Sequence, residues 1–214
     1  MQFTRVLGVL KGMDYPAEQI LAWAKSAQLV YAADGAARTL IEAGLAPVVV
    51  GDLDSFDRAS IPKGVRVVHD PDQETTDCDK LITLMAAEGV TCFTLAGLEG
   101  DRLDHVFASL CSLVGRRMQI RVLLRRGMGF IVPCGENFRL NCPSGTRFSV
   151  LPLTLCWGVN LTNAEWSMTD AELRPGLHVS ISNRSGEDTQ LILAGGTALV
   201  VIEGNPGDPP HWED

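Results

Sequence analysis

Short apolar runs alternate with amphipathic stretches up to about residue 125 of the chain. The runs Val6–Leu10 and Leu29–Ala33 are typical of buried strands, and the segment between them has the i, i+3, i+4 apolar spacing of a helix. The alternation continues, with strands predicted at 47–50, 65–68, 90–96 and 119–124 and helices at 36–43, from 77 onward and at 104–114. This pattern predicts βαβ units and therefore an α/β fold with a mostly parallel sheet covered on both faces.

The pattern changes after Arg126. Short apolar runs are now separated by Gly, Pro, Asn and Ser, which is typical of antiparallel strands in a sandwich or barrel. We expect the domain boundary near Arg125–Gly129. The predicted strands of this second part are Phe148–Leu151, Leu177–Ile181, Gln190–Leu193 and Ala198–Ile202.

Acidic residues gather behind the predicted strands of the first part. In parallel sheets, ligands bind beyond the carboxyl ends of the strands. Asp34, Asp52, Asp54, Asp70 and Asp72 each follow such a strand, so we expect their loops to face one crevice.

Composition narrows the class of protein. The 214 residues are 46% hydrophobic and 21% charged, which is ordinary for a globular chain with a sizeable core. A net charge of −8 argues against a broad nucleic-acid surface. The six cysteines form no C-x-x-C pair, which argues against a zinc site, and we expect most of them to be buried in a reducing compartment. Neither a signal peptide nor a membrane span is evident, so we expect a soluble cytoplasmic protein without a membrane partner.

The segment GDLDS, from Gly51 to Ser55, is a candidate metal site. In an extended segment, Asp52 and Asp54 would lie on the same side, two residues apart. Two such carboxylates suit Mg²⁺, which takes a few protein oxygens and shares the rest with phosphates and water. A polar turn without metal explains the same residues, because Asp and Ser are common in turns.

The segment DQETTDCDK, from Asp72 to Lys80, carries a helix-start signal at Thr76 and Asp79. Asp77 would lie in the first helical turn, where free backbone N–H groups can also meet a phosphate. Asp77 and Lys80 would share one face of the helix. Taken alone, this segment is explained by a capped helix with a solvated acidic loop.

The segment GLEGDRLDH, from Gly97 to His105, offers a phosphate clamp. Arg102 is suited to bidentate contact with phosphate oxygens, and a metal–phosphate site needs a second positive charge. Asp104 and His105 are candidates for orienting a substrate or supplying a base, although His105 is better explained as a helix-start residue without chemistry. The nucleotide motifs G-x-x-x-x-G-K-[ST] and G-x-G-x-x-G are both absent from the sequence.

Two features stand out in the second part. Trp166 would offer an aromatic face to a flat heterocycle, although a single Trp more often packs in a core or an interface. Ser182 and Asn183 end a predicted strand and are typical of a turn.

In this order and at these separations, the segments resemble the thiamine pyrophosphokinase family. The matching segments are ADGAARTL (Ala33–Leu40), GDLDS, DQETTDCDK, GDRLDH (Gly100–His105), EWSM and VSISN (Val179–Asn183). They extend over nearly the whole chain.

The resemblance implies a Rossmann-like α/β domain over residues 1–126 that binds ATP and Mg²⁺. It also implies a thiamine-binding β-sandwich over residues 127–203, followed by a tail at 204–214 that we expect to be loosely ordered. A homodimer with sites at the subunit interface is implied too. The reaction would move the β,γ-pyrophosphoryl group of ATP to the hydroxyl of thiamine, releasing AMP.

Site residues follow from the matched motifs as expectations. Asp52, Asp54 and Asp77 would surround Mg²⁺ and the triphosphate, and Arg102 and Asp104 would lie by the reacting ends. Asp77 and Asp104 are both candidates for the base. The nucleotide would also be contacted by Asp34, Gly35, Arg38, Gln73, Thr76 and Lys80, and thiamine by Trp166, Ser182 and Asn183.

The sequence departs from the family pattern in three places. Ala36 stands where a glycine is usual, so the backbone there loses easy access to positive φ. Asp101 replaces the glycine before Arg102 and adds a negative charge. Asn163 to Glu165 differ from the residues usual before Trp166, which bears on how thiamine is held.

Two other functions remain open from the residues. A metal-dependent glycosyl- or nucleotidyltransferase would use Asp52 and Asp54, but it leaves the second acidic loop and the β-rich part unexplained. A non-catalytic thiamine- or nucleotide-binding protein would fit the departures at Ala36 and Asp101.

Overall fold

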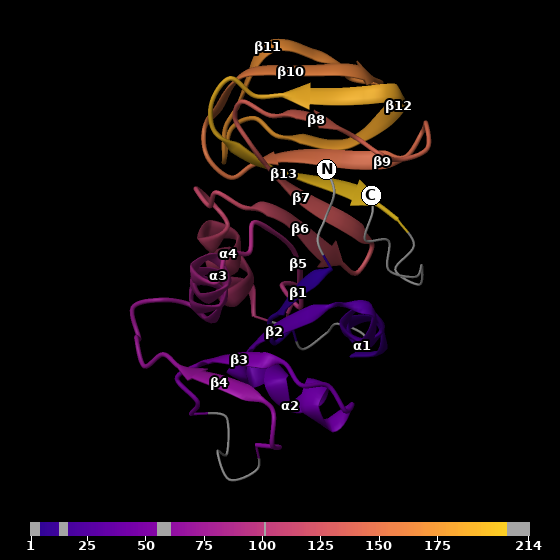
Figure 1. Ribbon diagram of the computed structural model, residues 1–214. Helices are drawn as coiled ribbons and strands as arrows, with labels where there is room; N and C mark the ends of the chain where they lie inside the picture. Colours follow the sequence, from indigo (N-terminus) through magenta and orange to yellow (C-terminus); the bar gives the residue numbers. More distant parts are fainter. Residues whose placement is uncertain (1–4, 13–16, 55–60, 101, 205–214) are drawn as a thin grey trace. The chain divides into compact units, whose positions relative to one another are not determined.

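The computed structural model describes residues 5–12, 17–54, 61–100 and 102–204 (Figure 1). The described chain divides into two compact units. Unit 1 holds the residues up to Ser112 together with Arg117–Arg125, and unit 2 holds Leu113–Arg116 and the residues from Arg126 onward. The expectations for Ser55, Asp101 and the tail from 205 lie outside the described residues.

Unit 1 is a parallel sheet flanked by helices. Its strands have the order β6-β5-β1-β2-β3-β4, and all five neighbouring pairs are parallel. The strands are β1 (Val6–Val9), β2 (Leu29–Ala33), β3 (Val48–Gly51), β4 (Arg66–His69), β5 (Cys92–Ala96) and β6 (Gln119–Leu124). The helices are α1 (Ala17–Ser26), α2 (Asp34–Glu42), α3 (Asp77–Ala87) and α4 (Leu103–Ser112).

The helices of unit 1 form two pairs, α1 with α2 and α3 with α4 (Figure 1). All five residues of β5 are buried, as expected for a central strand covered on both faces. Every predicted strand and helix of this part is found, with small differences at its ends. The helix predicted at 36–43 begins earlier, at Asp34, because the residues after β2 turn directly into the helix.

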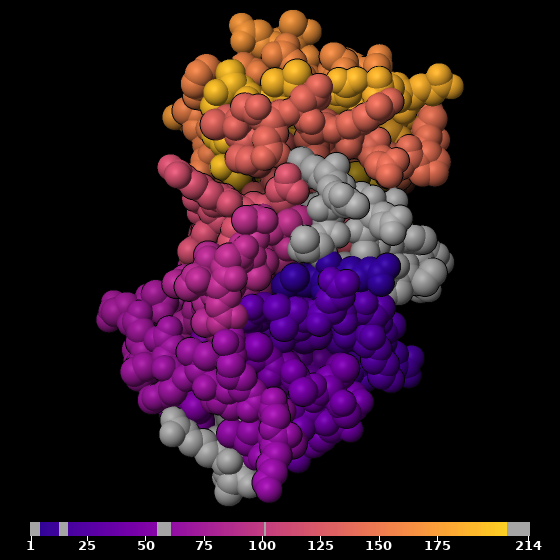
Figure 2. All heavy atoms as spheres, in the orientation of Figure 1, coloured from indigo at the N-terminus to yellow at the C-terminus, as the bar shows by residue number. Residues whose placement is uncertain are grey.

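Among the described residues of unit 2, every strand pair is antiparallel. The order of the strands is β11-β10-β12-β9-β13-β7, with β8 also paired to β12. Atoms of the β8 and β12 regions, far apart in the sequence, lie side by side in Figure 2. The strands are β7 (Gly127–Pro133), β8 (Asn137–Arg139), β9 (Arg147–Pro152), β10 (Cys156–Ala164), β11 (Met168–Leu173), β12 (Ser180–Ile192) and β13 (Thr197–Glu203).

One apolar core holds unit 2 together. It includes Phe138, Phe148 and Leu161, each at most 4% exposed, and the ring of Phe130 lies 5.3 Å from that of Phe138. The predicted strands at 177–181 and 190–193 are not separate elements, because β12 joins them. The first part of β12 pairs with β9, and its last part pairs with β8 and β10.

The cysteines differ in their burial, and fewer of them are buried than we expected. Cys78, Cys92 and Cys156 are buried, whereas Cys111 and Cys134 are exposed, so burial explains only half of the six cysteines. Within the described part of the chain, no helix is both long and apolar enough to cross a bilayer.

Candidate active site

The acidic loops of unit 1 lie at the carboxyl ends of its parallel strands. Asp34 follows β2 directly, Asp52 follows β3, and Asp70 follows β4. The register pairs Ala33 with Val50, and Gly51 with His69. These strands therefore end at one edge of the sheet, as the alternation of strands and helices predicts.

Asp34 is buried and holds the backbone of the neighbouring loop. Its carboxylate, only 6% exposed, accepts a hydrogen bond of 2.8 Å from the N–H of Leu53. A Cβ placed on Gly51 would lie 2.6 Å from the same carboxylate, so this approach requires glycine. Burial raises the pKa of Asp34, and the charges of Asp77 and Asp52 raise it further. Burial and the nearby carboxylates thus both disfavour the ionised form of Asp34.

The GDLDS segment is a tight turn and not the extended segment that we predicted. Leu53 has a φ of 65°, which is uncommon for a residue with a Cβ. The N–H of Asp54 donates to Oδ1 of Asp52 over 3.1 Å, so Asp52 closes the turn with its own side chain. The prediction failed because a left-handed leucine between two aspartates leaves no sign in the sequence.

Gln73 connects the two acidic segments. Its side-chain amide donates to Oδ2 of Asp52 over 3.1 Å. The hydrogen bond from the N–H of Asp54 lowers the pKa of Asp52 most, and the bond from Gln73 lowers it further. The charge of Lys80 adds to this effect. Asp52 therefore remains a carboxylate at neutral pH.

The second acidic segment begins α3 as predicted. The N–H of Asp79 donates to Oγ1 of Thr76 over 3.0 Å, and the N–H of Thr76 donates back to Asp79 over 3.2 Å. This capping box stabilises the helix start and leaves Asp77 in the first turn. Lys80 is 5% exposed, and its charge acts on Asp52 and Asp72. Thr76 is thus occupied in capping, while Asp77 remains available.

Arg102 and Asp104 form an exposed ion pair. The guanidinium donates to both carboxylate oxygens, at 2.6 and 3.2 Å, and this contact lowers the pKa of Asp104. A cavity of about 320 Å³ is lined by Arg102, His105 and Asp77, among others. The structure therefore brings Arg102 together with Asp77, and it places His105 beside them.

The acidic side chains of unit 1 can be tested as ligands for a divalent metal ion by the chemistry of their donor atoms. Carboxylates at Asp52, Asp54 and Asp77 are the oxygen donors that Mg²⁺ prefers. As placed, the described residues include no group of three or more His, Cys, Asp or Glu close enough to hold a metal ion. Mg²⁺ commonly takes only one or two protein carboxylates and completes its shell with phosphate and water. The donor set fits an ion shared with a nucleotide.

Arg38 and Gly35 differ in their placement. Arg38 is largely exposed on α2 and pairs with Glu42 at 2.8 Å. Gly35 lies against Lys11, because a Cβ on Gly35 would be 2.8 Å from Lys11 Cδ. Of the two, only Gly35 lines a cavity between α1 and α2.

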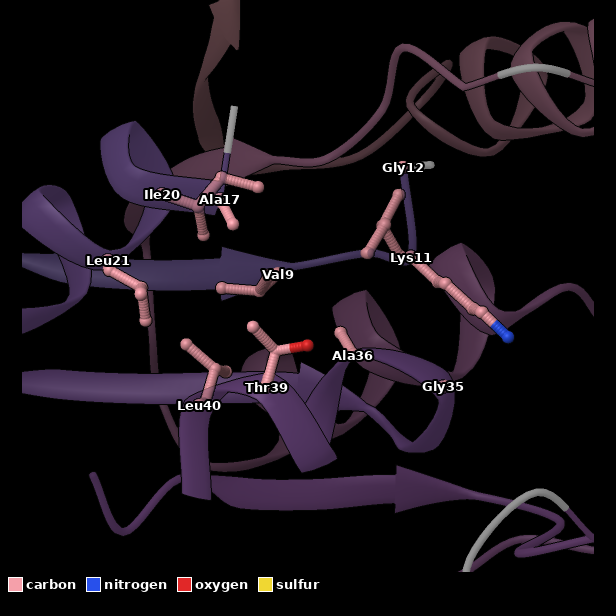
Figure 3. A pocket seen from close by; sticks show the side chains of 11 residues that line it. Val9, Lys11, Gly12, Ala17, Ile20, Leu21, Gly35, Ala36, Thr39 and Leu40 are labelled. Carbon is pink, nitrogen blue, oxygen red and sulfur yellow. The ribbon is translucent and has the colours of Figure 1, made fainter. Parts of the chain in front are cut away.

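Lys11 is a residue that our sequence interpretation missed. It lines both the 320 Å³ cavity and a second cavity of about 220 Å³ between α1 and α2 (Figure 3). Lys11 follows β1, so its position behind a predicted strand was the available signal. No motif marked it.

The residues expected to bind thiamine lie in unit 2, where Asn183 organises them. Asn183 is fully buried, and its amide donates to the carbonyl of Trp166 over 2.8 Å. The same side chain accepts from the N–H of Trp166 over 3.1 Å, while the indole of Trp166 is 56% exposed. The structure therefore brings Trp166 and Asn183 together and presents the aromatic ring to solvent.

Ser182 and Asn183 lie inside β12, so their assignment to a turn is wrong. Ser182 has a φ of 58°, and the pairing register shifts between Ser180 and Asn183. This shift is a bulge, which re-aims side chains within a strand. The N–H of Ser182 donates to the hydroxyl of Ser149 over 3.1 Å.

The structure also clarifies two of the departures from the family pattern. Ala36 lies in α2 with ordinary helical geometry, so glycine's conformational freedom is not needed there. Asn163 has a φ of 55°, and Glu165 lies 3.7 Å from Arg184. Asn163 and Ala164 therefore end β10, and the turn that follows at Glu165 is held to β12 by the contact with Arg184.

Comparisons with known proteins agree on one family. Residues 20–124 match the family model described as the catalytic domain of thiamin pyrophosphokinase. Thiamin pyrophosphokinase 1 of Caenorhabditis elegans is 29% identical over 169 residues, which are 72% of this chain and 68% of that protein.

Solved structures share the fold. Thiamine pyrophosphokinase from Bacillus subtilis superposes with a TM-score of 0.74 at 18% identity, over 92% of this chain and 98% of that one. Thiamin pyrophosphokinase from Candida albicans gives 0.73 at 15% identity, over 93% and 90%. With the sequence match that runs from α1 to β6, these findings show that the chain is similar to thiamin pyrophosphokinases.

Proposed function

We propose that the protein transfers the β,γ-pyrophosphoryl group of ATP to the hydroxyl of thiamine, giving thiamine diphosphate and AMP. The proposal rests on the acidic side chains, among them Asp34 and Asp52, that follow the parallel strands of unit 1. These residues lie within the segment that matches the family's catalytic domain. Such a transfer needs an in-line alcohol and neutralised phosphoryl oxygens, so positioning and electrostatics dominate catalysis.

Asp52, Asp54 and Asp77 would hold Mg²⁺ together with the triphosphate. When bound, the ion would neutralise charge on the phosphate oxygens. The side-chain amide of Gln73 donates to Oδ2 of Asp52 and so holds this carboxylate in place. Because the amide is used in this bond, Gln73 would contribute less to direct binding of phosphate. Thr76 acts chiefly through the cap that keeps Asp77 in the first turn of α3.

Arg102 supplies positive charge to the transferred group. Its contact with Asp104 orients the guanidinium and keeps Asp104 ionised at neutral pH. The lowered pKa also makes Asp104 a weaker base, so it would take the thiamine hydroxyl proton late, as the bond to phosphorus forms. Asp104 and Asp77 both remain candidates for this role.

Thiamine would stack on the exposed indole of Trp166. Asn183 acts indirectly, because its amide is used on the main chain of Trp166. Ser182, on the bulge of β12 and next to Asn183 in the chain, would offer its hydroxyl to the ligand. An aromatic face opposite a cationic thiazolium is favourable.

We infer the remaining organisation from the family. The parallel unit would be a Rossmann-like domain over residues 1–126, and the antiparallel unit a β-sandwich over residues 127–203. The protein would work as a cytoplasmic homodimer with sites at the subunit interface. No nucleic-acid or membrane partner is proposed. A non-catalytic binding protein loses one supporting feature, because Ala36 is accommodated in a regular helix.

A nucleotide assay tests the proposal. Purified protein with ATP, Mg²⁺ and thiamine should release AMP only when thiamine is present. Chromatography of the nucleotides distinguishes AMP from ADP. Release of ADP in place of AMP would rule out pyrophosphoryl transfer, and binding of thiamine without AMP would favour a non-catalytic protein.

A further inference from the structure

Lys11 stands at the exit of a central strand of unit 1. Strand β1 lies between β5 and β2, and the N–H of Leu10 donates to the carbonyl of Ala96 over 2.8 Å. The lysine therefore reaches the carboxyl edge of the sheet, where β2 delivers Asp34. This edge is the one that carries the proposed catalytic carboxylates.

Close backbone packing fixes the segment around Lys11. Gly97 has a φ of 73°, and a Cβ there would lie 2.0 Å from the carbonyl oxygen of Leu10. A Cβ on Gly12 would lie 2.4 Å from the carbonyl oxygen of Glu99. These two glycines let the exits of β1 and β5 touch, so the backbone of Lys11 has little freedom. Its stem in turn lies against Gly35.

The ammonium group of Lys11 forms no ion pair with the residues that the structure describes. Lys11 is also exposed. Arg102 shares its charge with Asp104, and Lys80 is buried, with a charge that acts on Asp52. A polyphosphate that arrives at this acidic edge needs additional positive charge. Lys11 is placed to provide it.

Two cavities meet at Lys11. One is mainly apolar and lies between α1 and α2, with Val9, Leu21 and Leu40 in its wall (Figure 3). The other contains Asp77 and Arg102. In Figure 3 the nitrogen of Lys11 points away from Val9 and Leu40. The aliphatic part of the Lys11 side chain thus lines the apolar cavity, while its ammonium group is accessible to an anionic ligand.

We propose that Lys11 binds the polyphosphate chain of the nucleotide donor, as a substrate-binding residue additional to Arg102. The identity of the ligand rests on the proposed function, whereas the placement of the lysine rests on the cavities and glycines described above. A charge-assisted hydrogen bond of this kind strengthens binding by about 10- to 100-fold. Its contribution weakens with ionic strength.

Binding of ATP and of inorganic tripolyphosphate, each with Mg²⁺ and without thiamine, tests the proposal by calorimetry. Lys11→Met keeps the stem and removes the charge, so both dissociation constants should rise by about 10- to 100-fold. Lys11→Arg should restore most of the affinity. The matched control is Lys25→Met, which changes an exposed lysine in the last turn of α1 that lines neither cavity.

In steady-state assays Lys11→Met should raise the KM for ATP and leave the KM for thiamine unchanged. Thermal melting checks that the variants fold alike. Affinities of Lys11→Met within twofold of the wild type, or a wild-type protein that binds neither polyanion, would overturn the proposal. If wild-type protein binds ATP but never forms AMP, the proposed function fails, and the binding comparison still decides the role of Lys11.

Discussion

Asp34 in unit 1 and Asn183 in unit 2 are both buried, and each holds a nearby loop through its backbone. Asn183 is a neutral amide that accepts from the N–H groups of Trp166 and Arg184 and donates to the carbonyl of Trp166. Asp34 is a carboxyl that accepts from Leu53 and lies near the negative charges of Asp52 and Asp77.

The two environments act on stability in opposite directions. A buried amide whose groups are satisfied supports the folded state, whereas a buried carboxylate near like charges opposes it. Groups of the second kind gather where a cation or a reaction is expected. The contrast separates a scaffold for an aromatic ring in unit 2 from a site built for charge in unit 1.

Asn183→Ala should give the largest effect and would test the scaffold side of this contrast. Three backbone hydrogen bonds lose their partner in a buried position, so the free energy of unfolding should fall by about 3 kcal/mol. Urea denaturation measures it. The control is Asn137→Ala, which removes an exposed amide bonded to Gln190 over 3.1 Å and should cost less than about 0.5 kcal/mol. Equal losses would show that burial of Asn183 does not matter.

Asp54→Asn tests the other half of the contrast, the acidic site of unit 1. If Asp54 is a metal ligand, turnover should fall by about 10²-fold, while the melting temperature stays near that of the wild type because the loop is exposed. Asp72→Asn is the matched control, since its carboxylate caps its own loop through Glu74 and Thr75. AMP release measures both variants. Near-normal turnover in Asp54→Asn would remove this residue from the site.

Trp166→Ala asks whether the amide of Asn183 serves a binding surface. Loss of the stacked ring should raise the KM for thiamine by about 10-fold and change turnover little. Trp157→Ala, which removes an indole of the same unit that is 55% exposed, should leave this KM unchanged. An unaltered KM in Trp166→Ala would return Trp166 to surface packing.

Asp34→Asn should give the smallest effect, and one of opposite sign. The folded pKa of Asp34 lies above the ordinary value of 3.8, so between these two values the folded state binds more protons than the unfolded state. Stability therefore falls as pH rises through this window, and the carboxylate opposes folding at pH 7. Asparagine still accepts from Leu53 without the charge.

The variant Asp34→Asn should therefore be slightly more stable than the wild type at pH 7, without added metal or nucleotide. The difference should vanish below pH 3.8, where both the folded and unfolded carboxyls are protonated. Urea denaturation at the two pH values checks the sign. A variant less stable than the wild type at pH 7 would contradict the contrast.

The sequence predicts unit 1 well because its strands are continuous apolar runs. The limits of Leu29–Ala33 and Gln119–Leu124 agree with the structure at both ends. The capping box at Thr76 was also predicted and is confirmed, since both its residues are polar and correctly spaced. Local chemistry is enough in each case.

Unit 2 was harder to predict because its polar positions belong to bulged strands. Ser182 and Asp188 have φ values of 58° and 57° within β12, so a continuous strand looked like two. In unit 1, Lys11 went unnoticed because its role depends on cavities formed by distant segments. Such features depend on tertiary contacts that no short window of sequence contains.

Burial of Leu53 limits how often the acidic loop opens. Its side chain is 8% exposed, and opening the turn would bring it into water at a cost of about 2 kcal/mol, besides breaking the bond to Asp34. A cost of this size keeps an open loop at about one molecule in thirty or fewer. The backbone that carries Asp52 and Asp54 is thus preorganised. An arriving nucleotide would meet them already in place, and little of its binding energy would go into ordering the loop.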